Sequence, residues 1–203
     1  MITTTMTSIE ARAEIMRDLP GVLRRVDMQD KRYRRAVIKA TRFPFYFEVE
    51  FTSKRGNRWV LYFEARSKRD MNDSRVSFVC LTDSRIGLHA FMPTTIDGDM
   101  FIVMYPPHFF SRYRDRFSPD LTGLPLIKRY FRHNYNFSLD FVARDGYKEI
   151  HAATKDGVAL GVLGVDNTFL FRTFVSFEML KGEQVSRFAE LASIRAEIHE
   201  TLK

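Results

Sequence analysis

The chain has 203 residues, which is long enough for one large domain to bury a core without disulfides or a structural metal. Hydrophobic residues make up 45% of it, and 19 Phe with 8 Tyr supply bulky apolar side chains, so the composition excludes a disordered protein. The net charge of +7 favours an anionic partner such as nucleic acid, and 23 of the 32 basic residues are Arg, which binds phosphate in bidentate fashion.

One cysteine, Cys80, excludes an intramolecular disulfide and a zinc site built on cysteines. Because Cys80 lies in the apolar run Val76–Leu81, we expect it to be a small buried side chain. The Thr-rich segment Met1–Ser8 lacks the basic and apolar regions of a signal peptide, and no apolar run reaches the ~18 residues of a membrane span. We therefore expect a soluble cytoplasmic protein that has no membrane partner.

Residues 8–41 have a helical pattern, and Thr7 with Glu10 three positions later fits a capping box. The Pro20-Gly21 pair predicts the end of a first helix, followed by a short second helix and by a third helix capped by Asp30. This segment is the densest basic stretch of the chain, and we expect it to contact phosphates; the alternative is a set of solvated helix faces. The candidate nucleic-acid-binding residues are Arg24, Arg25, Arg32, Arg34 and Arg35.

From residue 45 the apolar pattern changes to the two-residue period of strands. The sequence predicts five strands joined by polar turns, and therefore an antiparallel meander. Their expected bounds are Phe45–Thr52, Trp59–Ala65, Val76–Leu81, Ile86–Met92 and Met100–Tyr105. We expect Tyr46, Tyr62 and Arg66 to be exposed on this meander and to form a surface on which nucleic-acid bases stack.

Two helices are expected next, from about 108 to 117 and from about 124 to 133. Three further antiparallel strands (Tyr147–Thr154, Val158–Val165 and Phe169–Phe177) and a C-terminal helix over about 184–202 complete the pattern. The predicted fold class is α+β: N-terminal helices, a meander of about five strands, two helices, three strands and a final helix. Residues 1–203 are expected to form one domain; an alternative is a seam near 94–99 that separates 1–96 from 97–203.

The helix expected at 108–117 carries the most organised polar group of the sequence. Because residues four apart share a helix face, His108, Arg112 and Arg116 should lie together. His can transfer a proton near neutral pH, and two Arg can hold a phosphate and stabilise its developing charge. RNA cleavage needs little more, since the 2′-hydroxyl is the nucleophile. The alternative is an ordinary surface helix in which Asp115 pairs with a neighbouring Arg.

The His-x3-Arg-x3-Arg helix, a second short helix, three antiparallel strands and a C-terminal helix together resemble the BrnT branch of the RelE-like ribonuclease toxins. The resemblance covers about Pro106–Leu202, which is half of the chain. It implies that His108, Arg112 and Arg116 form the helix motif of that family. It also implies active-site residues on the late strand, where Arg172 and Thr173 lie within Phe171–Ser176.

No other motif of the sequence predicts a metal or a cofactor, so none is expected. His133 and His151 lack ligand spacing, and the glycines at 157–164 are not followed by the helix that a phosphate-binding loop requires. We expect a protein that binds nucleic acid, with RNA favoured; if it is an enzyme, we expect a metal-independent endoribonuclease. The alternatives are a non-catalytic module that binds an acidic protein and a small-molecule binding fold with a cavity between sheet and helices.

Overall fold

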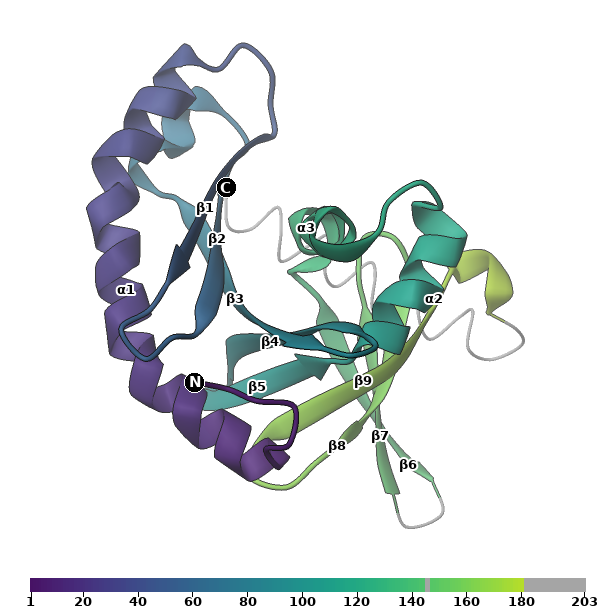
Figure 1. Ribbon diagram of the computed structural model, residues 1–203. Coiled ribbons are helices and arrows are strands. Elements are labelled where there is room, and N and C mark those ends of the chain that lie inside the picture. The colour runs from purple at the N-terminus through teal and green to yellow at the C-terminus, as the bar shows by residue number, and fades with distance from the viewer. Residues whose placement is uncertain (145–146, 181–203) are drawn as a thin grey trace. The chain divides into compact units, whose positions relative to one another are not determined.

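The computed structural model describes residues 1–144 and 147–180, and in this part the chain has three α-helices and nine β-strands (Figure 1). The helices are α1 (Ser8–Lys39), α2 (Pro107–Phe117) and α3 (Gly123–Asn134), with short 3-10 turns η1 (Lys68–Asn72) and η2 (Phe177–Met179). The strands are β1 (Phe45–Thr52), β2 (Arg58–Ala65), β3 (Arg75–Ser84), β4 (Gly87–Ile96), β5 (Asp99–Tyr105), β6 (Ser138–Arg144), β7 (Tyr147–Ala153), β8 (Val158–Leu163) and β9 (Thr168–Val175). The α+β class is confirmed, and the helix expected at 184–202 lies outside the described residues.

The chain forms two compact units. Unit 1 comprises Met1–Arg85 and Ala90–Ile102, and unit 2 comprises Ile86–His89 and the chain from Val103 onward. In unit 1 the strands follow the order β1-β2-β3-β4-β5, and in unit 2 the end of β5 is followed by β9, β8, β7 and β6. The strand pairs β1–β2, β2–β3, β6–β7, β7–β8 and β8–β9 are antiparallel, in agreement with the antiparallel strands that the sequence predicts.

The prediction of three N-terminal helices is wrong, because α1 is one continuous helix of 32 residues with Pro20 inside it. An interior proline removes one backbone hydrogen bond and costs about 3 kcal/mol. Pro20 is exposed, and the opposite side of α1 buries a long apolar stripe that includes Ile15, Val22 and Val37, each fully buried. Burial of such a side chain stabilises by roughly 1.5–3 kcal/mol, so packing outweighs the break.

The start of α1 follows the sequence prediction closely. The Thr7 side chain accepts from the Glu10 backbone N–H, and the Glu10 carboxylate accepts from the Thr7 backbone N–H at 2.8 Å, which completes the capping box. Asp30, by contrast, caps no helix. It lies within α1 and pairs with Arg34 one turn later, at 2.9 Å.

Unit 1 places α1 alongside the β1–β2 hairpin (Figure 1). The rings of Tyr33, Phe47 and Phe63 pack together between the helix and the strands, with centroids 5.4–6.3 Å apart. The register of the hairpin pairs Phe45 with Ala65 and Thr52 with Arg58. Nearly the whole of β2 is buried, which overturns the expectation that Tyr62 is exposed: its exposed fraction is 4%.

A buried polar group fixes the turn between β1 and β2 to α1. Arg55 donates to both oxygens of Glu14, at 2.9 and 2.6 Å, and the Met1 amino group donates to Oε1 of Glu14 at 2.8 Å. The Asn57 amide contacts both Glu14 and Asp18. Because donors surround both carboxylates, these two buried charges orient the turn instead of destabilising the unit.

Unit 2 contains one strand more than the sequence predicted. Residues 138–144 form β6, which pairs antiparallel with β7 from Ser138–Ala153 to Arg144–Tyr147. Phe137, Leu139 and Phe141 alternate with Ser138 and Asp140, so the two-residue period is present in the sequence. The expectation of three late strands is therefore wrong, and four are found.

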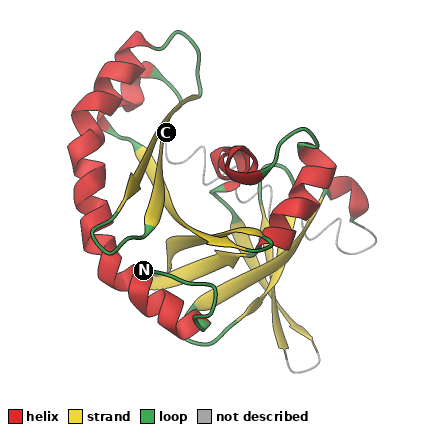
Figure 2. Ribbon diagram, in the orientation of Figure 1, coloured by secondary structure: helices red, strands yellow, loops and turns green. Residues whose placement is uncertain are grey.

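Helices α2 and α3 lie together beside β9 in unit 2 (Figure 2). The aromatic back of α2 packs into the interior: Phe109, Phe110 and Tyr113 are buried. Their rings meet Tyr105, Tyr130, Phe131, Phe171 and Phe174 in edge-on and tilted contacts with centroids 5.0–6.3 Å apart. This aromatic cluster holds α2 in a fixed position, so the polar side of α2 is presented from a rigid base.

Candidate functional site

The polar side of α2 carries two of the predicted site residues on its surface. His108 follows Pro107, the first residue of the helix, and Arg112 lies one turn later; both are exposed. Phe109 and Tyr113 point the other way into the aromatic cluster. An imidazole and a guanidinium are thus displayed together by a helix whose back is firmly packed.

Arg116, the third member of the predicted helix motif, has a structural partner. It is half-buried, and its guanidinium donates to the backbone carbonyl of Phe174 on β9. This bond ties the end of α2 to the strand. Asp115 pairs with Arg114 at 2.9 Å, as expected of a surface helix. His108 and Arg112 are therefore the two motif residues left on the surface.

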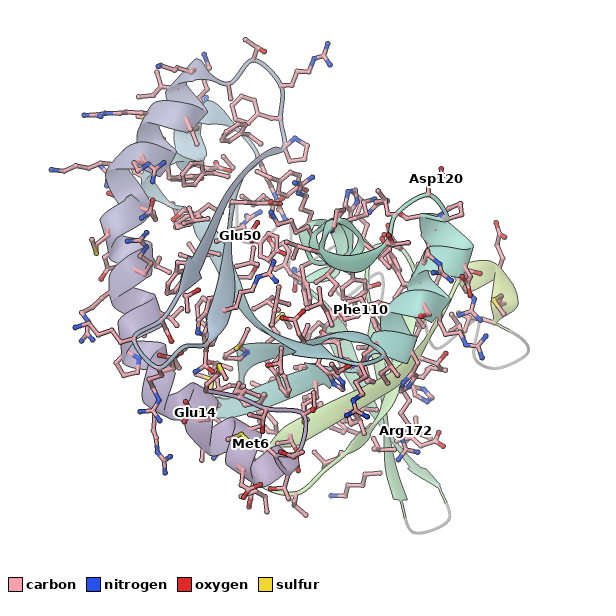
Figure 3. The ribbon with its side chains drawn as sticks, in the orientation of Figure 1. Met6, Glu14, Glu50, Phe110, Asp120 and Arg172 are labelled. Carbon is pink, nitrogen blue, oxygen red and sulfur yellow. The ribbon has the colours of Figure 1, made fainter. Side chains whose placement is uncertain are left out.

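Arg172 occupies a β-bulge in β9. Thr173 pairs with Leu160 and Phe171 pairs with Gly161, so Arg172 is the extra residue between the two pairs. The bulge turns both Phe171 and Phe174 toward the aromatic cluster, although they are three residues apart. Arg172 is exposed and leaves β9 on the side away from Phe110 (Figure 3).

Thr173 belongs to a row of side chains on that other side of the sheet. The pairs Thr173–Leu160, Leu160–His151 and His151–Asp140 align the row across four strands. His151 also lies 3.5 Å from the Glu149 carboxylate. The structure therefore places Arg172 and Thr173 on the sheet side that carries His151, and His108 with Arg112 on the helical side.

His89 is a histidine that sequence reasoning missed as a site residue. It lies near the start of β4, within unit 2, and is half-buried. Burial lowers its pKa, and the positive charge of His108 lowers that pKa further. The two residues are 19 positions apart, so no helix or strand period could have linked them.

A second polar group links α2, α3 and the turn between β7 and β8. Asp156 accepts hydrogen bonds from Tyr113 at 2.6 Å, Asn134 at 2.9 Å and Arg129 at 3.3 Å. Burial acts to raise the pKa of Asp156, but Tyr113, Asn134 and Arg129 lower it below its usual value. Burial, and then the bond to Asp156, raise the pKa of Tyr113. With these donors in place, Asp156 holds the turn against the helices.

The five predicted nucleic-acid-binding arginines of α1 fall into two classes. Arg34 pairs with Asp30, Arg32 donates to Gln29 at 3.2 Å, and the Arg25 guanidinium lies 5.6 Å from the centre of the Phe51 ring. Arg24 and Arg35 are exposed, and neither forms an ion pair with a described residue.

Two lysines extend the surface that Arg24 and Arg35 form. Helical spacing places Arg24, Lys31, Arg35 and Lys39 within one sector of α1, opposite its buried stripe. All four are exposed and lack a carboxylate partner in the described part of the chain. We call these four residues the α1 stripe; it extends over roughly 22 Å of helix at 1.5 Å per residue.

Residues 1–144 and 147–180 contain no group of three or more His, Cys, Asp or Glu side chains that could hold a metal ion. Cys80 is buried, as predicted, and burial raises the pKa of its thiol well above the usual range, so it is a poor nucleophile. None of the described helices is both long and apolar enough to cross a membrane.

Comparisons with known proteins found no match for this chain. No family model matches the chain, and no curated protein or solved structure matches it either. The resemblance of residues 106–202 to ribonuclease toxins therefore stays a prediction.

Proposed function

We propose that this protein binds RNA, and that the α1 stripe contacts the phosphates. The observation that carries the proposal is that Arg24, Lys31, Arg35 and Lys39 share one exposed side of a long helix without an ion pair to any described residue. Such cations attract a polyanion, and their binding to phosphates releases counterions. The net charge of +7 supports the same partner.

The test compares two variants that lose the same charge. Arg24→Gln/Arg35→Gln removes two stripe cations, whereas Arg34→Gln/Arg58→Gln removes two arginines that pair with Asp30 and Glu50. Binding of a labelled mixed-sequence single-stranded RNA is measured between 50 and 200 mM salt. The stripe variant should lose affinity, and its log–log salt slope should fall by about 1.4, at roughly 0.7 per phosphate contact.

The matched variant separates a specific surface from net charge. Its RNA affinity and salt slope should stay close to wild type. An equal loss in both variants overturns the stripe as the contact surface. Absence of RNA binding at low salt overturns the proposal itself, and binding of an acidic polypeptide in its place supports the alternative of a protein partner.

A second candidate function is metal-independent cleavage of the bound RNA. It is favoured by His108 and Arg112, which stand exposed one turn apart on α2, because a proton-transferring group beside a phosphate-binding group suits attack by the RNA 2′-hydroxyl. Cleavage of labelled RNA in EDTA by wild type and by His108→Ala tests it. Loss of cleavage with binding retained supports a catalytic His108, and equal cleavage by both proteins contradicts it.

A further inference from the structure

The start of β4 and the start of α2 approach each other closely within unit 2. Gly87 opens β4 with φ of 128°, a conformation that L side chains rarely adopt. A Cβ atom at Gly87 would lie 3.2 Å from Cβ of Pro107. The strand backbone therefore lies against the first turn of the helix, at a distance that suits glycine.

This approach brings His89 of β4 near His108 of α2. His108 directly follows Pro107, and His89 follows Gly87 by two residues, which in a strand directs both positions to the same side. The effect of His108 on His89 agrees with this placement, because the charge of His108 lowers the pKa of His89 in addition to the effect of burial.

We propose that His89 and His108 are the general base and the general acid of a metal-independent RNA cleavage site in which Arg112 binds the scissile phosphate. This inference rests on the proposed function and adds to it the second histidine and the reaction. Arg112 stands one helical turn after His108, so its guanidinium faces the same surface.

The reaction is a transesterification in which atoms and charges balance. Neutral His89 takes the proton of the ribose 2′-hydroxyl, and the 2′-oxygen forms a bond to phosphorus. The bond between phosphorus and the 5′-oxygen breaks, and protonated His108 gives its proton to that 5′-oxygen. The products are a 2′,3′-cyclic phosphate and a 5′-hydroxyl, with His89 protonated and His108 neutral.

The roles of His89 as the base and His108 as the acid follow from the surroundings of the two side chains. His89 is half-buried and its pKa is lowered, so it is neutral and able to accept a proton near pH 7. His108 is exposed at the helix surface, where the leaving oxygen can reach it. Among residues 1–144 and 147–180, the charge that lowers the pKa of His89 is that of His108 on the neighbouring helix.

The experiment measures cleavage of a labelled RNA in EDTA by wild type, His89→Ala, His108→Ala and His133→Ala. His133 is the matched control, since it is also half-buried with a pKa that burial and neighbouring arginines lower, but it lies on α3 beside Asp156. Cleavage should fall about 100-fold or more in the first two variants and stay near wild type in the third. RNA affinity should stay within about twofold in all of them.

Four further readouts make the result specific. A substrate with 2′-deoxyribose at the cleaved nucleotide should resist cleavage, and the product should carry a 2′,3′-cyclic phosphate. The pH–rate profile of wild type should be bell-shaped, as a general base and a general acid that act together require. His89→Gln, which keeps the size and polarity of the side chain, should fail to cleave while melting at the wild-type temperature.

The failures are distinguishable from one another. RNA binding without cleavage by wild type overturns the histidine pair and leaves the binding proposal intact. Full cleavage by His89→Ala or His89→Gln removes His89 from the site and leaves His108 as the candidate. Absence of RNA binding at low salt overturns the proposed function and this inference together.

Discussion

The indole Nε1 of Trp59 donates a 2.8 Å hydrogen bond to Oδ2 of Asp18, so a fully buried ring on β2 is joined to a buried carboxylate on α1. The same oxygen accepts from the Asn57 amide at 2.9 Å. This one carboxylate therefore satisfies donors from the strand and from the turn that precedes it. Its removal leaves buried N–H groups unpaired, which costs more than the loss of a surface bond.

Asp18→Ala should lower the free energy of unfolding by about 2–4 kcal/mol, since the Trp59 indole loses its partner in a buried site. Urea denaturation followed by tryptophan fluorescence measures it. Asp27→Ala is the control, because Asp27 is exposed on the same helix and should change stability by no more than about 0.5 kcal/mol. Equal losses in the two variants would contradict the role of the buried bond.

Stability should fall as the pH drops from about 4.5 toward 2. The Arg55 guanidinium lowers the pKa of Glu14 to about 2 from its ordinary 4.5. A carboxyl group with a depressed folded-state pKa stabilises the fold fully above its unfolded pKa, and this contribution disappears as the pH falls through the folded value. Because Arg55 is partly exposed, solvent weakens its ion pair with Glu14, and we expect this contribution to the free energy of unfolding to be about 2 kcal/mol.

Urea denaturation of wild type and Glu14→Gln between pH 6 and pH 2.5 measures this contribution. The difference between the two proteins should be largest near neutral pH and should shrink below pH 4.5. A difference that stays constant across this range would show that Glu14 titrates at its ordinary value in the folded chain.

Gly161→Ala should destabilise the protein by about 2–3 kcal/mol or more, because a Cβ atom there would lie 2.3 Å from the carbonyl oxygen of Leu170. Gly21→Ala is the matched control. Its new Cβ would meet nothing closer than the Arg24 side chain at 4.0 Å, and alanine in a helix stabilises by about 0.5–1 kcal/mol relative to glycine. Thermal melts should therefore shift in opposite directions.

Tyr113→Phe should cost about 1.5–3 kcal/mol, since the hydroxyl donates to a charged and half-buried carboxylate while the ring packing is kept. A double-mutant cycle with Asp156→Asn tests the bond itself. The two changes should be non-additive by about 1 kcal/mol or more. Additive losses would mean that Tyr113 and Asp156 act independently.

A thiol reagent in excess should react slowly with Cys80 in the folded protein and should modify one thiol per chain in denaturant. Burial raises the pKa of the thiol and blocks access to it, so the thiolate is scarce in the native state. The time course of the thiol–reagent product measures both rates. Rapid modification under native conditions would contradict a buried position.

Local patterns predicted most of the elements. The capping box of Thr7 and Glu10 and the hairpin at residues 45–65 were both predicted, because each depends on neighbours that are close in the sequence. The break at Pro20 was wrong for a tertiary reason, since packing of the far side of α1 decides the outcome there. The sequence analysis did not predict β6, although apolar and polar residues alternate at its start.

The candidate site was harder to predict, because its parts meet through tertiary contacts. Helical spacing correctly placed His108 and Arg112 on one surface, but it could not show that Arg116 bonds to the Phe174 carbonyl. The approach of His89 to His108 depends on how β4 meets α2, and no sequence period encodes it.

The bulge at Arg172 makes residue 172 of β9 dispensable for the pairing of the strand. Phe171 and Phe174 both face the aromatic cluster because one extra residue separates them. Many side chains can occupy position 172, which is exposed. Deletion of that single residue would restore plain alternation, with Phe171 and Phe174 then two positions apart and still on the same side of the sheet. This strand therefore tolerates both substitution and loss of its bulge residue.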